Sequence, residues 1–174
     1  MFIPELTTRV SVKMDTSELD SAMDVIQSDS ILSEIPSLND AFEEVKEKIT
    51  GLQEPLVDGV ADRLSSIQEM IISSKHYKTG MMSNNVDVTE DGDDRLVGNS
   101  AMSPLGFPYP LAIEKGSVAH WVAPVTFSVL HWVKNGTDYY SKGHMVSGIK
   151  ADPFVQPSID DTMDYIDSIL NEIW

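Results

Sequence analysis

Apolar side chains recur every three or four residues along a long central run of the chain. The run extends from residue 37 to about residue 75 and stays in phase through Gly51 and Pro55. Such a stripe is typical of an amphipathic helix, although proline inside a helix forces a kink or a break. The stripe consists of Leu38, Phe42, Val45, Ile49, Leu52, Leu56, Val60, Leu64, Ile67 and Ile71. The pattern predicts one long helix, kinked at Pro55 or broken there into two collinear pieces.

Shorter patterns flank this helix. Residues 7–14 alternate apolar and polar side chains, which is the period of a half-buried strand. Residues 19–26 then carry apolar side chains at helical spacing, so a short helix is expected there. The spacing is helical again from residue 158 to residue 174, with Ser158 as the N-cap. The expected inner face of this last helix consists of Ile159, Met163, Ile166, Leu170 and Ile173.

The segment between the two helices has the alternation and turn residues of β structure. A hairpin with an acidic tip is expected around residues 90–94, and a proline-rich loop with a brief helix over residues 104–117. Residues 122–140 are rich in strand-forming side chains, and an Asn-Gly pair within them is a favoured two-residue hairpin turn. This segment therefore predicts several short antiparallel strands.

Together these elements predict a single α+β domain over residues 1–174, in which the long helix packs on a small antiparallel sheet. Its expected parts are an N-terminal strand and short helix over 1–36, the long helix over 37–75, a β-rich part over 76–157 and a C-terminal helix over 158–174.

Charge narrows the possible partners. Twelve Lys and Arg stand against 28 Asp and Glu, a formal net charge of −16, and the acids are spread along the chain. A dispersed acidic excess resembles proteins from high-salt cytoplasms, where the Debye length falls to about 3 Å at 1 M salt and screens self-repulsion. The alternative is an ordinary acidic protein. In either case the sequence argues against tight binding to a phosphate backbone.

The residues that carry chemistry form no recognised catalytic pattern. The chain has no cysteine, no phosphate-cradling glycine loop, no nucleophile elbow and no HExxH helix. No window approaches the roughly 18 uninterrupted apolar residues of a membrane helix. One conceivable metal site would combine His120, His131 and His144 with Asp138. The spacing of these residues matches no metal-ligand pattern, so packing or surface roles are expected for the histidines. The sequence therefore predicts a protein that is not an enzyme and needs neither cofactor nor metal.

Three short motifs occur in a fixed order after the long helix. The first is "TGMMSNN" at residues 79–85, the second "YPLAIEKGS" at 109–117, and the third "ADPFVQPS" at 151–158. A fourth segment, with Leu130, Trp132 and the Asn135-Gly136 turn, lies between the second and the third motif and belongs to the same pattern. Their order and spacing resemble the tail-completion (neck, or head–tail joining) family of long-tailed phages and archaeal tailed viruses. That family has Thr-Gly-x-Leu-x-x-Ser, Tyr-Ala-x-x-Val-Glu-x-Gly-Thr and Ala-x-Pro-Phe-Leu-x-Pro-Ala at these places. Met82 and Asn85 depart from the first motif.

The resemblance implies a structural virion protein. Family members form a ring, with six-fold symmetry favoured and twelve-fold possible, between the head–tail connector or adaptor proteins and the tail terminator or tail tube protein. DNA would pass through the lumen without sequence-specific binding, and no membrane would be involved. The protein would be made in the host cytoplasm and located in the virion neck. The acidic composition adds a haloarchaeal virus as the expected source.

The motif segments also provide the candidate residues for contacts with subunits or partners. These are Tyr109, Glu114, Trp132, Phe154 and Val155. Prolines 153 and 157 fix their own φ and disfavour a helical backbone at the residues before them. An extended strip is therefore expected ahead of the last helix. Phe154 and Val155 would then point in opposite directions, one of them toward a neighbour. Alternatively, both residues close the domain's own core.

A different class of function remains as the alternative. The chain could be an acidic halophilic cellular α+β domain that binds a protein or a small molecule. Such a domain would be a monomer or a dimer, and its gene would not lie among portal and tail genes.

The charge generates a prediction about salt. If the excess of acids is an adaptation to a high-salt cytoplasm, the melting temperature should rise as KCl increases from low to multi-molar concentration, because screening relieves self-repulsion. Thermal melts followed by circular dichroism measure this. A flat or falling melting temperature would indicate an ordinary acidic protein.

Overall fold

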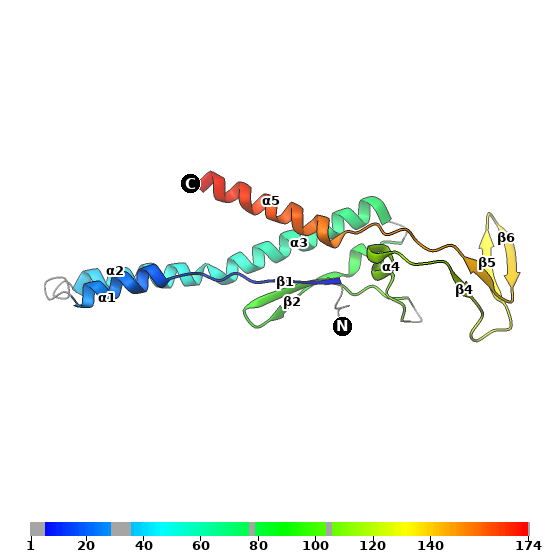
Figure 1. The fold of residues 1–174 in the computed structure, drawn as a ribbon, viewed down its shortest axis with the longest axis horizontal. Coiled ribbons are helices and arrows are strands. Elements are labelled where there is room, and N and C mark those ends of the chain that lie inside the picture. The colour runs from blue at the N-terminus through cyan, green and yellow to red at the C-terminus, as the bar shows by residue number, and fades with distance from the viewer. Residues whose placement is uncertain (1–5, 29–35, 77–78, 104–105, 174) are drawn as a thin grey trace.

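The computed structural model describes residues 6–28, 36–76, 79–103 and 106–173, arranged as an elongated α+β fold (Figure 1). The elements in chain order are β1 (Thr7–Val10), α1 (Ser17–Ser28), α2 (Pro36–Gly51), α3 (Gln53–His76), the 3-10 turn η3 (Ser83–Asn85), β2 (Val86–Asp91), β3 (Asp94–Asn99), α4 (Tyr109–Lys115), β4 (His120–Val122), β5 (Leu130–Lys134), β6 (Thr137–Ser141), β7 (His144–Val146) and α5 (Val155–Ile173). The predicted α+β class is confirmed. Among the described residues, no helix combines the length and the apolar character needed to cross a membrane.

The long helix is bent at a break just before Pro55. Helix α2 ends at Gly51 and α3 begins at Gln53, and the Leu52 N–H donates to the Ile49 carbonyl at 3.1 Å. Pro55 lies in the first turn of α3, where its missing N–H costs nothing, while its ring excludes a helical carbonyl at Gly51. The predicted break is confirmed, and its position follows from this clash four residues upstream.

A three-stranded antiparallel sheet packs on α3, with β3 in the centre between β1 and β2. The predicted hairpin is β2–β3, with Asp91 opposite Asp94 at its acidic tip. Strand β1 is shorter than the predicted 7–14. Its last residue, Val10, pairs with Arg95, the second residue of β3, so only Ser11 among the following residues still faces a residue of that strand.

Ion pairs at the edges hold the sheet in place. Arg9 on β1 contacts Asp91 and Asp94 at 2.5 and 2.7 Å, and this hydrogen bond from Arg9 lowers the pKa of Asp94. Arg95 is buried and donates from its Nε to Asp58 of α3 at 2.7 Å. The hairpin is therefore tied both to β1 and to α3.

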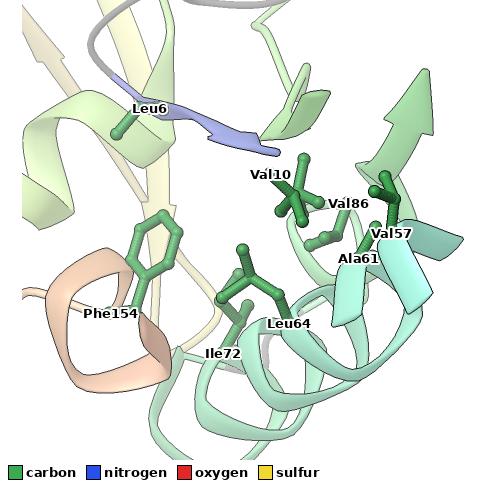
Figure 2. Packing of buried hydrophobic residues seen from close by; sticks show 9 residues of the cluster. Leu6, Val10, Val57, Ala61, Leu64, Ile72, Val86 and Phe154 are labelled. Atoms are coloured by element: carbon green, nitrogen blue, oxygen red, sulfur yellow. The ribbon is translucent and has the colours of Figure 1, made fainter. Parts of the chain in front are cut away.

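The core lies between this sheet, α3 and the start of α5 (Figure 2). Figure 2 shows the side chains from α3 facing those from β1 and β2, with Phe154 closing the end nearest α5. The buried cluster consists of Leu6, Val10, Val57, Ala61, Leu64, Ile72, Val86, Val97 and Phe154.

Helix α5 packs antiparallel to α3 through small side chains. Ser158 and Thr162 are buried, and their hydroxyls donate to the carbonyls of Val155 and Ser158, both at 2.7 Å. Small residues whose hydroxyls are satisfied within the helix allow close approach, so the face centred on them is the inner one. The expected inner face is therefore wrong at Met163, which is 51% exposed, whereas Ile159 and Ile166 are partly buried. The side chains of Leu170 and Ile173 lie outside the described residues.

Beyond α4 the chain forms an arm, residues 118–150, that extends away from the rest of the fold (Figure 1). It contains two separate two-stranded sheets, β4–β7 and β5–β6. Asn135 and Gly136 both have positive φ, 52° and 76°, which confirms the predicted Asn-Gly hairpin turn. The short antiparallel strands expected here are present as these two short ladders.

The chain exposes far more surface than a compact protein of its mass. Its accessible surface is 12020 Å². A compact monomer of 19.2 kDa would expose roughly 8,400 Å². The excess, about 3,600 Å², is more than the total surface buried in a standard protein–protein interface.

Phe154 anchors α5 to the core, and its removal should show this. Phe154→Ala deletes a side chain that is fully buried, so it should lower the free energy of unfolding by roughly 3–5 kcal/mol. Met163→Ala, on the outer side of the same helix, should change it by less than about 0.5 kcal/mol. Urea denaturation in high salt measures both, and equal effects would contradict the observed orientation of α5.

Candidate functional site

The three motifs converge beside the C-terminal end of α3. We call this region the motif junction; it comprises residues 79–83, 109–117 and 149–155. The amide of Asn99 on β3 donates to the Met82 carbonyl at 2.8 Å, which fixes the first motif against the sheet. The Asp152 N–H donates to the Ile113 carbonyl at 2.9 Å, which joins the second motif to the third. Segments far apart in sequence thus form one site.

Glu114 joins the second motif to α5. Its Oε2 accepts hydrogen bonds from the backbone N–H groups of Phe154 at 2.8 Å and Val155 at 3.2 Å. These are unsatisfied donors at the start of a helix, where the helix dipole favours a negative charge. Glu114 therefore caps α5 from a distant part of the chain, the role expected of Ser158. The helix starts at Val155, so the predicted extended strip is wrong for residues 155–157.

Gly116 lets the second and third motifs approach closely. Its φ is 73°, and a Cβ at this position would lie 2.8 Å from both the Ala151 nitrogen and the Ile149 oxygen. The Ser117 N–H donates to the Ile149 carbonyl at 2.8 Å, and the Ser117 hydroxyl accepts from the Ile149 N–H at 3.1 Å. A side chain at residue 116 would both strain the backbone and separate these segments.

Ion pairs tie the third motif to the end of α3. The ammonium of Lys75 lies 3.3 Å from one Asp152 oxygen, and Nε2 of His76 lies 3.5 Å from the other. His76 is largely buried, while Lys75 is exposed. The carboxylate also sits at the C-terminal end of α3, where the helix dipole disfavours a negative charge, and the ammonium of Lys75 offsets this.

A cavity of about 570 Å³ opens at the motif junction. Its walls are mainly apolar and come from the end of α3, the first motif and α4, with Met81 and Phe107 exposed at its edge. A cavity of this size and character can accept an apolar side chain or a short peptide. Its lining includes Ile72, Lys75, His76, Met82, Tyr109 and Ile113.

The structure brings together four of the five candidate contact residues. Tyr109 lines the cavity, and Glu114 caps α5. Phe154 is fully buried in the core and Val155 packs partly buried against it, as in the alternative in which both close the domain's own core. Trp132 lies on β5 in the arm, at the end of the molecule away from the junction (Figure 1).

His131 and Asp138 are in contact, but the four residues weighed as metal ligands do not form one site. His131 contacts Asp138 across the hairpin at 2.6 Å, while the ring of His144 packs on Trp132 at 5.0 Å. His120 instead bonds to the Val118 carbonyl. In the described part of the chain, no three acidic or histidine side chains are placed to hold a metal ion.

Sequence reasoning missed two features of the junction. The link from the end of α3 to Asp152 joins residues far apart in sequence, 77 positions for Lys75, and no local pattern signals it. The position of Gly116 does carry a signal, because a glycine directly after a short helix often adopts positive φ as its C-cap.

Replacing Glu114 should weaken the start of α5. Glu114→Gln keeps the shape but removes the charge, and should lower the free energy of unfolding by about 1–2 kcal/mol, because hydrogen bonds to charged groups are the stronger ones. Asp160→Asn, an exposed acid on α5, serves as the control and should change it by less than about 0.5 kcal/mol. Chemical denaturation compares them, and equal small effects would contradict the capping role.

No protein-family model, no curated protein and no solved structure matches this chain. The functional inference therefore depends on the motifs and on their arrangement in space.

Proposed function

We propose that this chain is a non-enzymatic structural virion protein that forms a ring in the neck of a tailed virus. The observation that supports this best is the convergence of the three motifs at one junction. Residues shared with the family motifs have specific structural tasks there, since Glu114 caps α5 and Gly116 permits close packing. Motifs that interlock in this way are expected if the family resemblance reflects a common fold.

The shape of the subunit supports the same proposal. An elongated chain with an excess surface of about 3,600 Å² over a compact monomer has ample area for neighbours on both sides. In a ring each subunit uses two different surfaces, one for each neighbour. The proposed ring, six-fold or twelve-fold, would join the connector or adaptor proteins to the tail terminator or tail tube.

The net charge of −16 suits a channel for DNA. An acidic wall does not displace the counterions of a phosphate backbone, so it provides no tight grip and lets DNA slide. The proposed location is the virion neck, after synthesis in the host cytoplasm.

The alternative, an acidic halophilic binding domain, is favoured by one observation. The cavity at the motif junction is large enough for a small ligand or a short peptide. In that case the protein would act as a monomer or dimer, and the cavity would be its binding site.

The oligomeric state distinguishes the two functions. Purified protein in multi-molar KCl should form closed rings of identical subunits, with a mass from light scattering that is a multiple of 19.2 kDa consistent with six or twelve copies. Electron microscopy of the protein, and of tailed particles that contain it, would show the ring at the neck. A strict monomer within assembled particles would refute the proposal, and saturable binding of a small ligand by a monomer would favour the alternative.

A further inference from the structure

The β5–β6 hairpin in the arm is largely uncovered on both faces, although the ring of His144 packs on Trp132. Every residue from His131 to Tyr140 is exposed, including Tyr140 at 66% and Trp132 at 37%. Neighbouring residues on a strand point to opposite faces, so both faces of the β5–β6 hairpin carry exposed aromatic rings. The arm outside the hairpin adds the exposed side chains of Val118, Trp121, Val125, Phe127 and Met145.

The aromatic rings stiffen this hairpin but do not bury it. Trp132 stacks on Tyr139 across the strands at 5.7 Å, and His131 stacks on Tyr140 at 4.8 Å. An isolated two-stranded hairpin is marginally stable in water, and an exposed apolar patch of this kind marks an interaction surface. The arm therefore requires a partner that covers aromatic side chains.

The arm also has the opposite charge from the rest of the chain. Residues 118–150 contain Lys134, Lys142 and Lys150 against Asp138 alone, a formal net charge of +2. The remaining residues carry nine basic against 27 acidic side chains, a net charge of −18. The acidic excess is thus absent from the arm, whose electrostatic complement is an acidic protein surface such as the chain itself provides.

Helix α5 offers a surface of matching chemistry. Its outer side combines the exposed apolar side chain of Met163 with the exposed acids Asp160, Asp164 and Asp167. Tyr165 and Ile169 are also exposed, but they lie on the flank that continues the inner stripe, where Arg63 of α3 packs on the Tyr165 ring. The helix contains no lysine or arginine. In Figure 1 the arm and α5 extend in opposite directions from the motif junction, so the arm does not reach this surface within one chain.

We propose that the arm of one subunit docks on the outer side of α5 of a neighbouring copy. Apolar contact would cover the aromatic rings of the hairpin, while Lys134 and Lys142 would meet the acids of α5. The contact is head-to-tail, because it joins two different surfaces, and a contact of this type closes into a ring when the rotation between subunits allows it. The choice of a second copy as the partner rests on the proposed ring.

Cross-linking between two single-cysteine variants tests this contact directly, because the native chain has no cysteine. Tyr140→Cys places a thiol on the arm, and Asp164→Cys places one on α5. Mixed in equal amounts under mild oxidation, the two variants should form a disulfide-linked dimer that contains one of each. Glu44→Cys, an exposed acid on α2, is the matched control and should give no such dimer with Tyr140→Cys. Efficient cross-linking to residue 44 but not to residue 164 would overturn the proposal.

Charge-reversal variants provide a second test of the contact. Lys134→Glu together with Lys142→Glu should weaken self-association by about tenfold or more at moderate salt, as measured by sedimentation. Adding Asp160→Lys and Asp164→Lys should restore it, whereas Asp40→Lys and Glu44→Lys should not. Circular dichroism checks that each variant is folded. Unchanged self-association in the first variant would overturn the arm contact.

The same variants separate this contact from other roles of the arm and from the proposed function. If the arm lysines govern binding to single-stranded DNA or to anionic vesicles instead of self-association, the inference falls. If rings form at the neck while the arm variants assemble normally, the proposed function stands and this inference falls. If the arm and α5 cross-link in an assembly that is absent from viral necks, the contact stands and the proposed function falls.

Discussion

The apolar face of α3 is the surface on which the rest of the fold is assembled. The sheet packs on Val57, Ala61 and Leu64 of this face through Val10 and its neighbours. Further along the helix, Ile72 faces the end where Phe154 closes the core. Gln68 is a polar residue within this apolar stripe, and its side chain is fully buried. The side-chain amide of Gln68 has no hydrogen-bond partner among the described residues. An unmade hydrogen bond of this kind costs about 1–3 kcal/mol, so the helix bears a local penalty in the centre of its most important face.

Local patterns were sufficient to predict the elements whose partners are local. The helical stripe gave the long helix and its break, and the Asn-Gly pair at residues 135–136 gave the hairpin turn. The boundaries that depend on distant residues were not predictable in this way. Strand β1 stops at Val10 because β3 begins at Asp94, and α5 starts at Val155 because Glu114, 41 residues earlier, caps it there. Hydropathy also misplaced the inner face of α5, because buried hydroxyls satisfied within the helix look polar in sequence.

For the candidate site, the motifs identified the right segments but not what they do. Nothing local distinguishes a glutamate that caps a distant helix from one on the surface, so the role of Glu114 required the three-dimensional structure. The prolines around Phe154 suggested an extended strip, yet Pro157 is compatible with the first turn of a helix, where no N–H is needed. The exposure of the hairpin was equally hidden, because alternating aromatic residues look the same in a covered strand and in an uncovered one.

A small core and a large exposed surface have a consequence for how such a subunit reaches its final form. The sheet, α3 and the start of α5 share one buried cluster, whereas the arm has no comparable core. In the proposed ring, binding to a neighbour adds free energy to the folded state of each subunit, since a partner that binds only the folded chain stabilises it by mass action. Stability would then depend on protein concentration, and the arm would gain most from assembly, because its hairpin has the most apolar surface left to bury. Folding and assembly would therefore be coupled most strongly in the arm.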